Sequence, residues 1–356
     1  MKVFHCDHCG HLLFFENTQC VRCGHAVAYL PDLACVGSLD QGDDGTWRSP
    51  QAVASSQGYR LCDNYAIHAV CNWAIPAGDS HTLCISCRLT RLIPDLSVET
   101  HRTNWYRLEA AKRRLVFTLL ALGLPVASRD QDPECGLAFE FLADDSEGPV
   151  TTGHAGGVIT VNLAEADDAE RERRRQSLNE PYRTLAGHLR HESGHYYWDR
   201  LIGGTGALSR FRALFGDERA DYTGALQAYY ASGPAADWQQ RFISGYASAH
   251  PFEDWAETWA HYLHMIDTLE TAAACGFSLR PRRADEPSLP VLPPFVVSGR
   301  VPFDRLIESW FPLTYALNNL TRGLGQADAY PFVLTPAAIE KLRFVHETAS
   351  TSCCRH

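Results

Sequence analysis

Two histidines and a glutamate stand in the order H-E-x-x-H at His191, Glu192 and His195. Side chains four residues apart lie on one face of a helix, so both imidazoles could bind a single Zn²⁺. Glu192 would then lie beside the metal, where it could take a proton from a metal-bound water. An ordinary amphipathic helix can carry the same pattern by chance, so the assignment of a catalytic zinc site depends on a further ligand elsewhere in the chain.

The class of zinc peptidases whose motif continues with a glycine and a third histidine is excluded, because Trp198 and Leu201 occupy those positions. The third zinc ligand could then be an acidic residue from a later helix. The segment HPFEDWAETWAHYLH offers Glu253 and Glu257 at a step of four, directly after Pro251, a residue that favours a helix start. One glutamate could bind zinc while the other accepts a hydrogen bond from a ligand histidine.

The segment FGDERADY is the alternative source of the third ligand. Asp217 or Glu218 could reach the metal, with Asp221 in support. We favour Glu253, because the helix start at Pro251 brings it into the first turn. His188 lies three residues before His191, so it could support the centre, face the substrate, or simply pack in the core.

Cysteine pairs dominate the first ninety residues. One set has two pairs at two-residue spacing, each followed by glycine, which is typical of a closed structural zinc site: Cys6, Cys9, Cys20 and Cys23. A second set has this spacing in only one pair, and we expect a second structural zinc there: Cys62, Cys71, Cys84 and Cys87. The sequence therefore predicts one catalytic and two structural Zn²⁺ ions.

The chain has 356 residues, 45% hydrophobic content, 13 cysteines and a formal net charge of −10. An acidic balance argues against nucleic-acid binding and gives no attraction to membranes. The N-terminus lacks the apolar stretch of a secretory signal, and the longest apolar run, 115–125, is too short to span a bilayer. We therefore expect a cytoplasmic protein whose cysteines bind metal instead of forming disulfides.

Several segments resemble a bacterial family of zinc-binding metallopeptidases that carry a zinc-ribbon domain, and the resemblance covers nearly the whole chain. They are YRLCDNYAI, CNW, LCISCRLTRLIPDLS, GHLRHESGHYYW, FGDERADY, HPFEDWAETWAHYLH and YPFVLTPAAIEKLRFVHE. The catalytic half is also similar to gluzincins such as anthrax lethal factor, in which a tyrosine, a ligand glutamate and a further glutamate follow the motif. The resemblance implies that Glu253 is the third ligand, that Glu257 supports a ligand, and that Tyr246 steadies the oxyanion.

These observations predict an α+β protein with a β-rich zinc-ribbon region at 1–95 and a mainly helical, zincin-like metallopeptidase domain at 96–356. We expect helices at 103–122, 181–202, 305–320 and 335–348, and strands at 136–142 and 157–163. The second strand should form the edge of its sheet, where an extended substrate could pair with it. The tail with Cys353 and Cys354 is interpreted as a disordered end.

The expected function is zinc-dependent hydrolysis of a peptide or protein amide bond, with Glu192 as the general base. Two alternatives remain open: a non-catalytic zinc-ribbon scaffold that binds proteins, and a zinc hydrolase that acts on an isopeptide or another amide. The intact Glu192 favours an enzyme. Because the chain is acidic, we expect the ribbon to recruit a protein partner and not nucleic acid.

Overall fold

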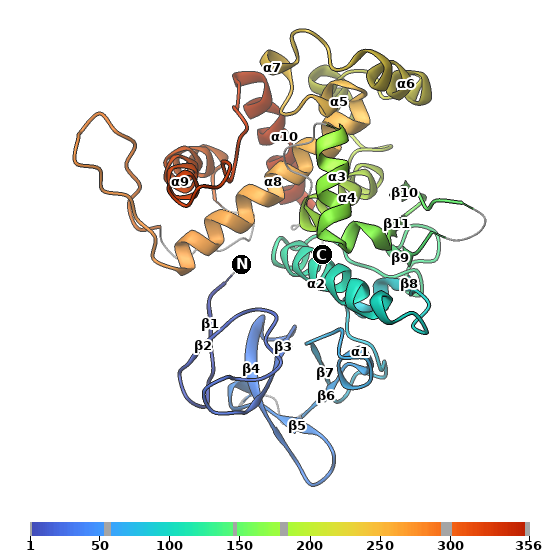
Figure 1. The fold of residues 1–356 in the computed structure, drawn as a ribbon, viewed down its shortest axis with the longest axis vertical. Coiled ribbons are helices and arrows are strands. Elements are labelled where there is room, and N and C mark those ends of the chain that lie inside the picture. The colour runs from blue at the N-terminus through green and yellow to red at the C-terminus, as the bar shows by residue number, and fades with distance from the viewer. Residues whose placement is uncertain (1, 53–57, 145–147, 179–183, 293–300, 353–356) are drawn as a thin grey trace.

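The computed structural model describes residues 2–52, 58–144, 148–178, 184–292 and 301–352. Figure 1 shows a β-rich N-terminal region on one side of helix α2 (Glu99–Ala121) and a mainly helical region on the other. The architecture is therefore α+β, as the sequence predicts. Within the described residues, no helix has both the length and the apolar character needed to cross a membrane. Cys353 and Cys354 lie outside the described residues.

The N-terminal region contains a short ribbon and one antiparallel sheet. Strand β1 (Phe4–His5) pairs with β2 (Leu12–Leu13), and helix α1 (Asp63–Ala66) follows the fourth strand of the sheet. Successive side chains of a strand point to opposite faces, so Val27 and Tyr29 enter the main core while Ala28 and Leu30 enter a smaller one. The sheet order is β3 (Ala26–Leu30), β4 (Cys35–Gln41), β5 (Trp47–Arg48), β6 (Tyr59–Leu61) and β7 (Ala74–Pro76).

A second sheet has four strands in the order β10 (Gly153–Ala155), β11 (Val158–Asn162), β9 (Ala138–Leu142) and β8 (Thr90–Leu92). The strands predicted at 136–142 and 157–163 correspond to β9 and β11. The prediction that the second of them forms the sheet edge is wrong, because β10 pairs with it in antiparallel register. Gly156 and Gly157 have φ of 54° and 85°, which closes a tight hairpin and folds β10 back onto β11.

The helical region begins with α3 (Asp168–Leu178) and α4 (Leu185–Leu201). Helix α4 starts later than predicted, because the Thr184 side chain accepts a hydrogen bond from the backbone N–H of Gly187 at 3.0 Å and caps it. Residues 181–183 of the predicted helix lie outside the described residues. The remaining helices are α5 (Leu208–Phe215), α6 (Tyr222–Ser232), α7 (Trp238–Arg241), α8 (Pro251–Ala274), α9 (Phe303–Gly323) and α10 (Pro336–Ser352).

Helices α4 and α8 pack closely against each other. A Cβ atom at Gly194 would lie 2.9 Å from Cα of Ala256, so only glycine permits this approach. The indole N–H groups of Trp255 and Trp259 donate to the Gly194 carbonyl and the Ser193 hydroxyl, at 2.8 and 3.1 Å. The contact brings the H-E-x-x-H helix against the acidic helix.

The two regions share one hydrophobic core. Phe117 of α2 lies 5.3 Å from Phe15 and 5.6 Å from Tyr29, measured between ring centroids. All three rings are buried in the same cluster. Strand β8 directly follows the second cysteine set in the chain, yet it pairs with β9 of the second sheet. The helical region is thus packed directly on the cysteine-rich region.

Candidate metal centre

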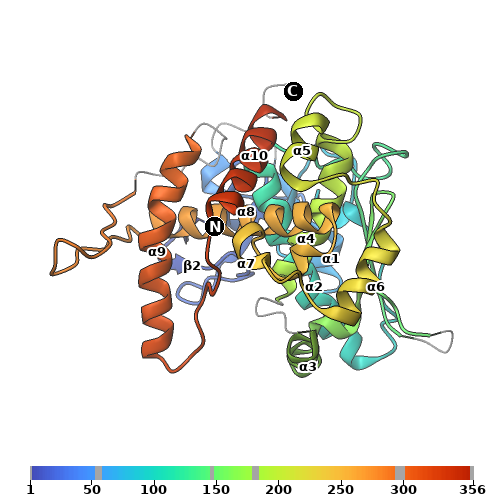
Figure 2. The same ribbon diagram turned by 90° about the horizontal axis from the view of Figure 1, so that it is seen from above.

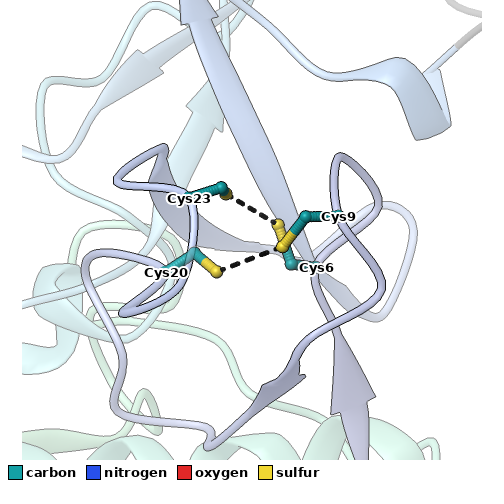
Figure 3. Close-up of side chains that lie close together, drawn as sticks. All are labelled: Cys6, Cys9, Cys20 and Cys23. Atoms are coloured by element: carbon teal, nitrogen blue, oxygen red, sulfur yellow. Dashed lines mark hydrogen bonds between the residues drawn. The ribbon is translucent and has the colours of Figure 1, made fainter.

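The first cysteine set forms a compact cluster between two turns of the N-terminal ribbon. Figure 3 shows the four sulfur atoms pointing toward one another. The Sγ atoms of Cys6 and Cys23 lie 3.7 Å apart, and those of Cys9 and Cys20 lie 3.6 Å apart. Four thiolates bound to one Zn²⁺ at about 2.3 Å would lie about 3.8 Å from one another, so the cluster has the size of a tetrahedral zinc site.

The second cysteine set also comes together, although only one of its pairs has knuckle spacing. Its four sulfurs are mutually close, and all four residues are buried: Cys62, Cys71, Cys84 and Cys87. The Sγ atoms of Cys71 and Cys84 lie 3.8 Å apart, again the edge length of a tetrathiolate zinc site. Backbone N–H groups donate to the sulfurs of Cys62, Cys71 and Cys84.

A buried arginine from α2 stands beside the second cluster. Arg113 donates to the Val70 carbonyl and lies 4.0 Å from Glu109. Burial alone would lower the pKa of Arg113, but the charges of the neighbouring cysteines and of Glu109 raise it. A tetrathiolate zinc site carries net negative charge, so this guanidinium is placed to compensate it.

A third group, His8, Cys23 and His25, shares a cysteine with the first cluster. The two imidazoles stack face to face, with centroids 3.7 Å apart. Cys23 already belongs to the first cluster, where four thiolates complete the shell of one zinc, so the two histidines have no third ligand of their own. We assign no separate metal site to this group.

The catalytic candidates converge where α4 meets α8. Ligand atoms of His191, His195 and Glu253 all lie within 4.8 Å of one another. Oε2 of Glu253 is 3.0 Å from Nε2 of His191, and Oε1 is 3.6 Å from Nε2 of His195. Burial would raise the pKa of Glu253, but the two facing histidines lower it to about 2, so the side chain is an anionic carboxylate.

Glu257 orients His191 from the next turn of α8. Its Oε1 lies 2.8 Å from Nδ1 of His191, and its Oε2 accepts a hydrogen bond from the Ser244 hydroxyl at 2.6 Å. A carboxylate can only accept, so Nδ1 of His191 carries the proton, and Nε2, the nitrogen that faces Glu253, is the one that would supply a lone pair to a metal. This is the arrangement usual for a histidine that binds metal.

The chemistry of this donor set fits a cation. Nε2 of His191 lies 3.0 Å from Oε2 of Glu253, a buried oxygen that accepts no hydrogen bond of good geometry from any described residue. Burial would lower the pKa of His191, but Glu253 and Glu257 raise it well above its usual value, so this position favours a positive charge. A Zn²⁺ between Nε2 and Oε2 would satisfy both atoms, with two imidazoles and one carboxylate as its ligands.

The side chain of Glu192 is paired with the imidazole of His188. Nε2 of His188 lies 3.4 Å from Oε1 of Glu192, and its Nδ1 lies 3.6 Å from Oε2 of Glu165, in a short 3₁₀ helix (Leu163–Ala166). Burial would lower the pKa of His188, but the two carboxylates raise it to about 9. A protonated His188 would keep Glu192 ionised and oriented.

We predict that His188→Ala lowers turnover about 10-fold and leaves the zinc content unchanged, because the side chain supports Glu192 and not the metal. Glu165→Gln should change turnover in the same direction by a smaller factor. Steady-state hydrolysis and elemental zinc analysis on the same samples would check this. A His188→Ala protein that keeps full activity, or that loses one zinc, would show that His188 has a different role.

Tyr246 lies near the centre, as the resemblance to gluzincins implies. Its ring centroid is 5.9 Å from that of His191. Burial, followed by the charge of Glu253, raises its pKa, so the phenol stays protonated and can donate a hydrogen bond. A direct role in catalysis stays a prediction.

The alternative ligands of the FGDERADY segment are held elsewhere. Both oxygens of Asp217 pair with the guanidinium of Arg219, at 2.8 and 2.7 Å. Glu218 pairs in the same way with Arg212. Asp221 caps α6 by accepting from the backbone N–H of Gly224 at 3.1 Å.

Two residues near the centre were not predicted from the sequence. The Tyr222 hydroxyl donates to Oε1 of Glu253 at 2.6 Å. The imidazole of His154, on strand β10, lies nearly parallel to that of His195 with centroids 6.3 Å apart. The dipeptide Gly156-Gly157 is a hairpin signal that could have predicted β10. Tyr222 is the last residue of FGDERADY, but the sequence marks only the acids of that segment as ligand candidates.

Two family models match the two regions of the chain. The model of a family described as "Putative zinc-binding metallo-peptidase" matches residues 101–348, and a zinc-ribbon domain model matches residues 3–98. Uncharacterized proteins of Mycobacterium bovis and Mycobacterium tuberculosis are each 45% identical over 348 residues, covering 97% of this chain and 94% of their own. No solved structure matches the chain. The chain therefore belongs to this family of zinc-binding metallopeptidases and carries an N-terminal zinc ribbon.

Proposed function

We propose that the protein is a zinc-dependent peptidase of the gluzincin type, with His191, His195 and Glu253 as the catalytic ligands. The observation that carries the proposal is the meeting of these three side chains around a buried Glu253 oxygen to which no described residue donates a hydrogen bond of good geometry. Glu192 follows the ligand His191 in the chain and is also buried, with 5% of its surface exposed, so it lies beside this centre. The proposed substrate is a peptide or protein.

Zinc bound by these ligands would act as a Lewis acid toward water and toward the scissile carbonyl. The Glu192 carboxylate accepts a proton from the water that attacks the carbonyl carbon. It then delivers this proton to the leaving nitrogen as the C–N bond breaks, so the carboxylate is regenerated. The neutral phenol of Tyr246 donates a hydrogen bond to the developing oxyanion. Glu257 keeps His191 in the tautomer that leaves Nε2 free to bind.

Zinc content tests the ligand set before any substrate is known. We expect about three zinc ions per intact chain, and about two in Glu253→Ala, because two closed sites and one open site are proposed. Asp217→Ala is the matched control, since the competing assignment would make this acid the ligand, and it should keep about three.

Two outcomes would contradict the proposal in different ways. A third zinc that survives Glu253→Ala but is lost in Asp217→Ala would move the ligand to the FGDERADY segment. An intact chain that holds only its two ribbon zincs would favour a non-catalytic scaffold.

A further inference from the structure

The segment FGDERADY reaches the metal centre through its last residue. Its acids Asp217 and Glu218 are engaged by arginines, whereas Tyr222 directs its hydroxyl at Oε1 of Glu253 from 2.6 Å. The Tyr222 ring lies edge-on to the ring of His250, with centroids 5.1 Å apart. One edge of the ring stays open to solvent, since the residue is 39% exposed. The phenol therefore extends from the surface into the centre.

The two oxygens of Glu253 have different surroundings. Oε1 accepts the Tyr222 hydrogen bond, and Oε2 lies 3.0 Å from Nε2 of His191 without accepting any hydrogen bond from a described residue. A phenol that donates to one carboxylate oxygen lowers the ability of that oxygen to bind a cation. The asymmetry therefore favours Oε2 as the atom that would bind metal.

His250 links the segment that carries Tyr222 to the helix that carries Glu253. Its Nδ1 accepts a hydrogen bond from the backbone N–H of Phe252 at 3.2 Å and so caps α8. The proton is then on Nε2, which donates to the Ala220 carbonyl at 3.2 Å. Because His250 is 3% exposed, this buried side chain fixes Tyr222 and Glu253 relative to each other.

Helix α6 lies at the surface but contacts the centre through a second tyrosine, since Tyr229 packs edge-on against Tyr246 with ring centroids 5.5 Å apart. None of its residues is buried, and Figures 1 and 2 both show the helix on the outside of the helical region. The position of Tyr222 depends on this contact, on its hydrogen bond to Glu253 and on the His250 link. A hydroxyl that a surface helix directs at a buried carboxylate is better explained by a role at the centre than by packing.

We propose that Tyr222 is a positioning residue of the metal centre, which restrains Oε1 so that Glu253 binds zinc through Oε2 alone. A glutamate that binds through one oxygen leaves the fourth position of a tetrahedral site open, whereas binding through both oxygens would crowd it. This inference rests on the proposed function, because it requires Glu253 to be the third ligand.

Tyr222→Phe removes the hydroxyl and keeps the ring, and Tyr315→Phe, a half-exposed tyrosine on α9, is the matched control. The full chain is loaded with zinc, and the metal of the open site is then exchanged for Co²⁺. The same treatment of His191→Ala gives the background from the two cysteine clusters. Chelator competition measures the affinity of the third metal, and the visible absorption of Co²⁺ reports its coordination number.

We expect Tyr222→Phe to keep the third metal but to bind it roughly 10- to 100-fold more weakly. The Co²⁺ absorption should fall, because five-coordinate Co²⁺ absorbs less strongly than four-coordinate Co²⁺. Tyr315→Phe should match the intact protein in both measurements. Unchanged affinity and spectrum in Tyr222→Phe would overturn the proposal, and so would weaker binding with an unchanged spectrum, since that would indicate a purely structural role.

Failure of the proposed function gives a different result. If the intact chain binds only two metals, or if Glu253→Ala keeps the third, then the ligand set and the role of Tyr222 both fail. If Glu253→Ala loses the third metal and only the Tyr222→Phe result is negative, the peptidase proposal stands and the role of Tyr222 is rejected.

Discussion

Glu192→Gln is expected to reduce peptide hydrolysis about 10³-fold or more while leaving the zinc content at about three per chain. Glutamine has nearly the same shape as glutamate, so the packing around this buried side chain is kept. It cannot accept a proton from water, however, and it removes the negative charge that faces His188. The loss should therefore appear in turnover, with little change in metal binding or thermal stability.

The measurement is cleavage of a complex peptide mixture followed by mass spectrometry, because the substrate sequence is not required in advance. Glu308→Gln on α9 makes the same chemical change at an exposed glutamate, 62% accessible, and should leave hydrolysis unchanged. Full hydrolysis by Glu192→Gln would mean that another group activates the water. If the intact protein with three zinc ions cleaves nothing in the mixture, an isopeptide or another amide becomes the substrate to test.

Those parts of the centre that form within one element could be predicted from the sequence. His191 and His195 share a helical face because they are four residues apart, and Pro251 begins the helix that presents Glu253. The paired cysteines cluster for the same reason, since each knuckle is a local turn. Residue spacing contains enough information for such contacts.

The contacts between elements could not be predicted in the same way. Whether Glu253 or Glu218 faces the histidines depends on how closely α4 and α8 approach, and that approach is set by Gly194 against Ala256. Tyr222 reaches Glu253 only because a loop and a helix cap meet at His250. No periodicity marks such a residue, because it is the first residue of a helix that buries none of its side chains.

The sheet edge shows a different kind of error. The sequence predicts the strand at 157–163 correctly but places it at the edge of its sheet, the position that β10 occupies. A strand of three residues is too short for an alternating pattern to be recognised, so the sequence predicts no element at β10. The hairpin glycines Gly156 and Gly157 contained the missing information, since two consecutive glycines favour a tight turn.

Loss of the second cysteine cluster should unfold the helical region, whereas loss of the first should not. Cys87→Ser and Cys9→Ser are matched substitutions. Each replaces the second cysteine of a C-x-x-C pair by serine, a side chain that does not ionise. Structural zinc sites contribute on the order of 10 kcal/mol to folding, which is comparable to the whole stability of a domain. The two variants differ in where that free energy acts.

Cys87 is fully buried in the core that α2 shares, next to Arg113, and Cys9 is half-buried beside the short β1–β2 ribbon. Without zinc, Arg113 would lose the thiolate charges and keep only Glu109, which also pairs with Lys112. A buried cation that is only partly compensated costs several kcal/mol. We therefore expect the helical region of Cys87→Ser to be unfolded already, so that no cooperative melting transition remains. Far-ultraviolet circular dichroism as a function of temperature measures this. Cys9→Ser should lose one zinc and lower the melting temperature by only a few degrees. The opposite order of effects would show that the helical region depends on the first cluster and not on the second.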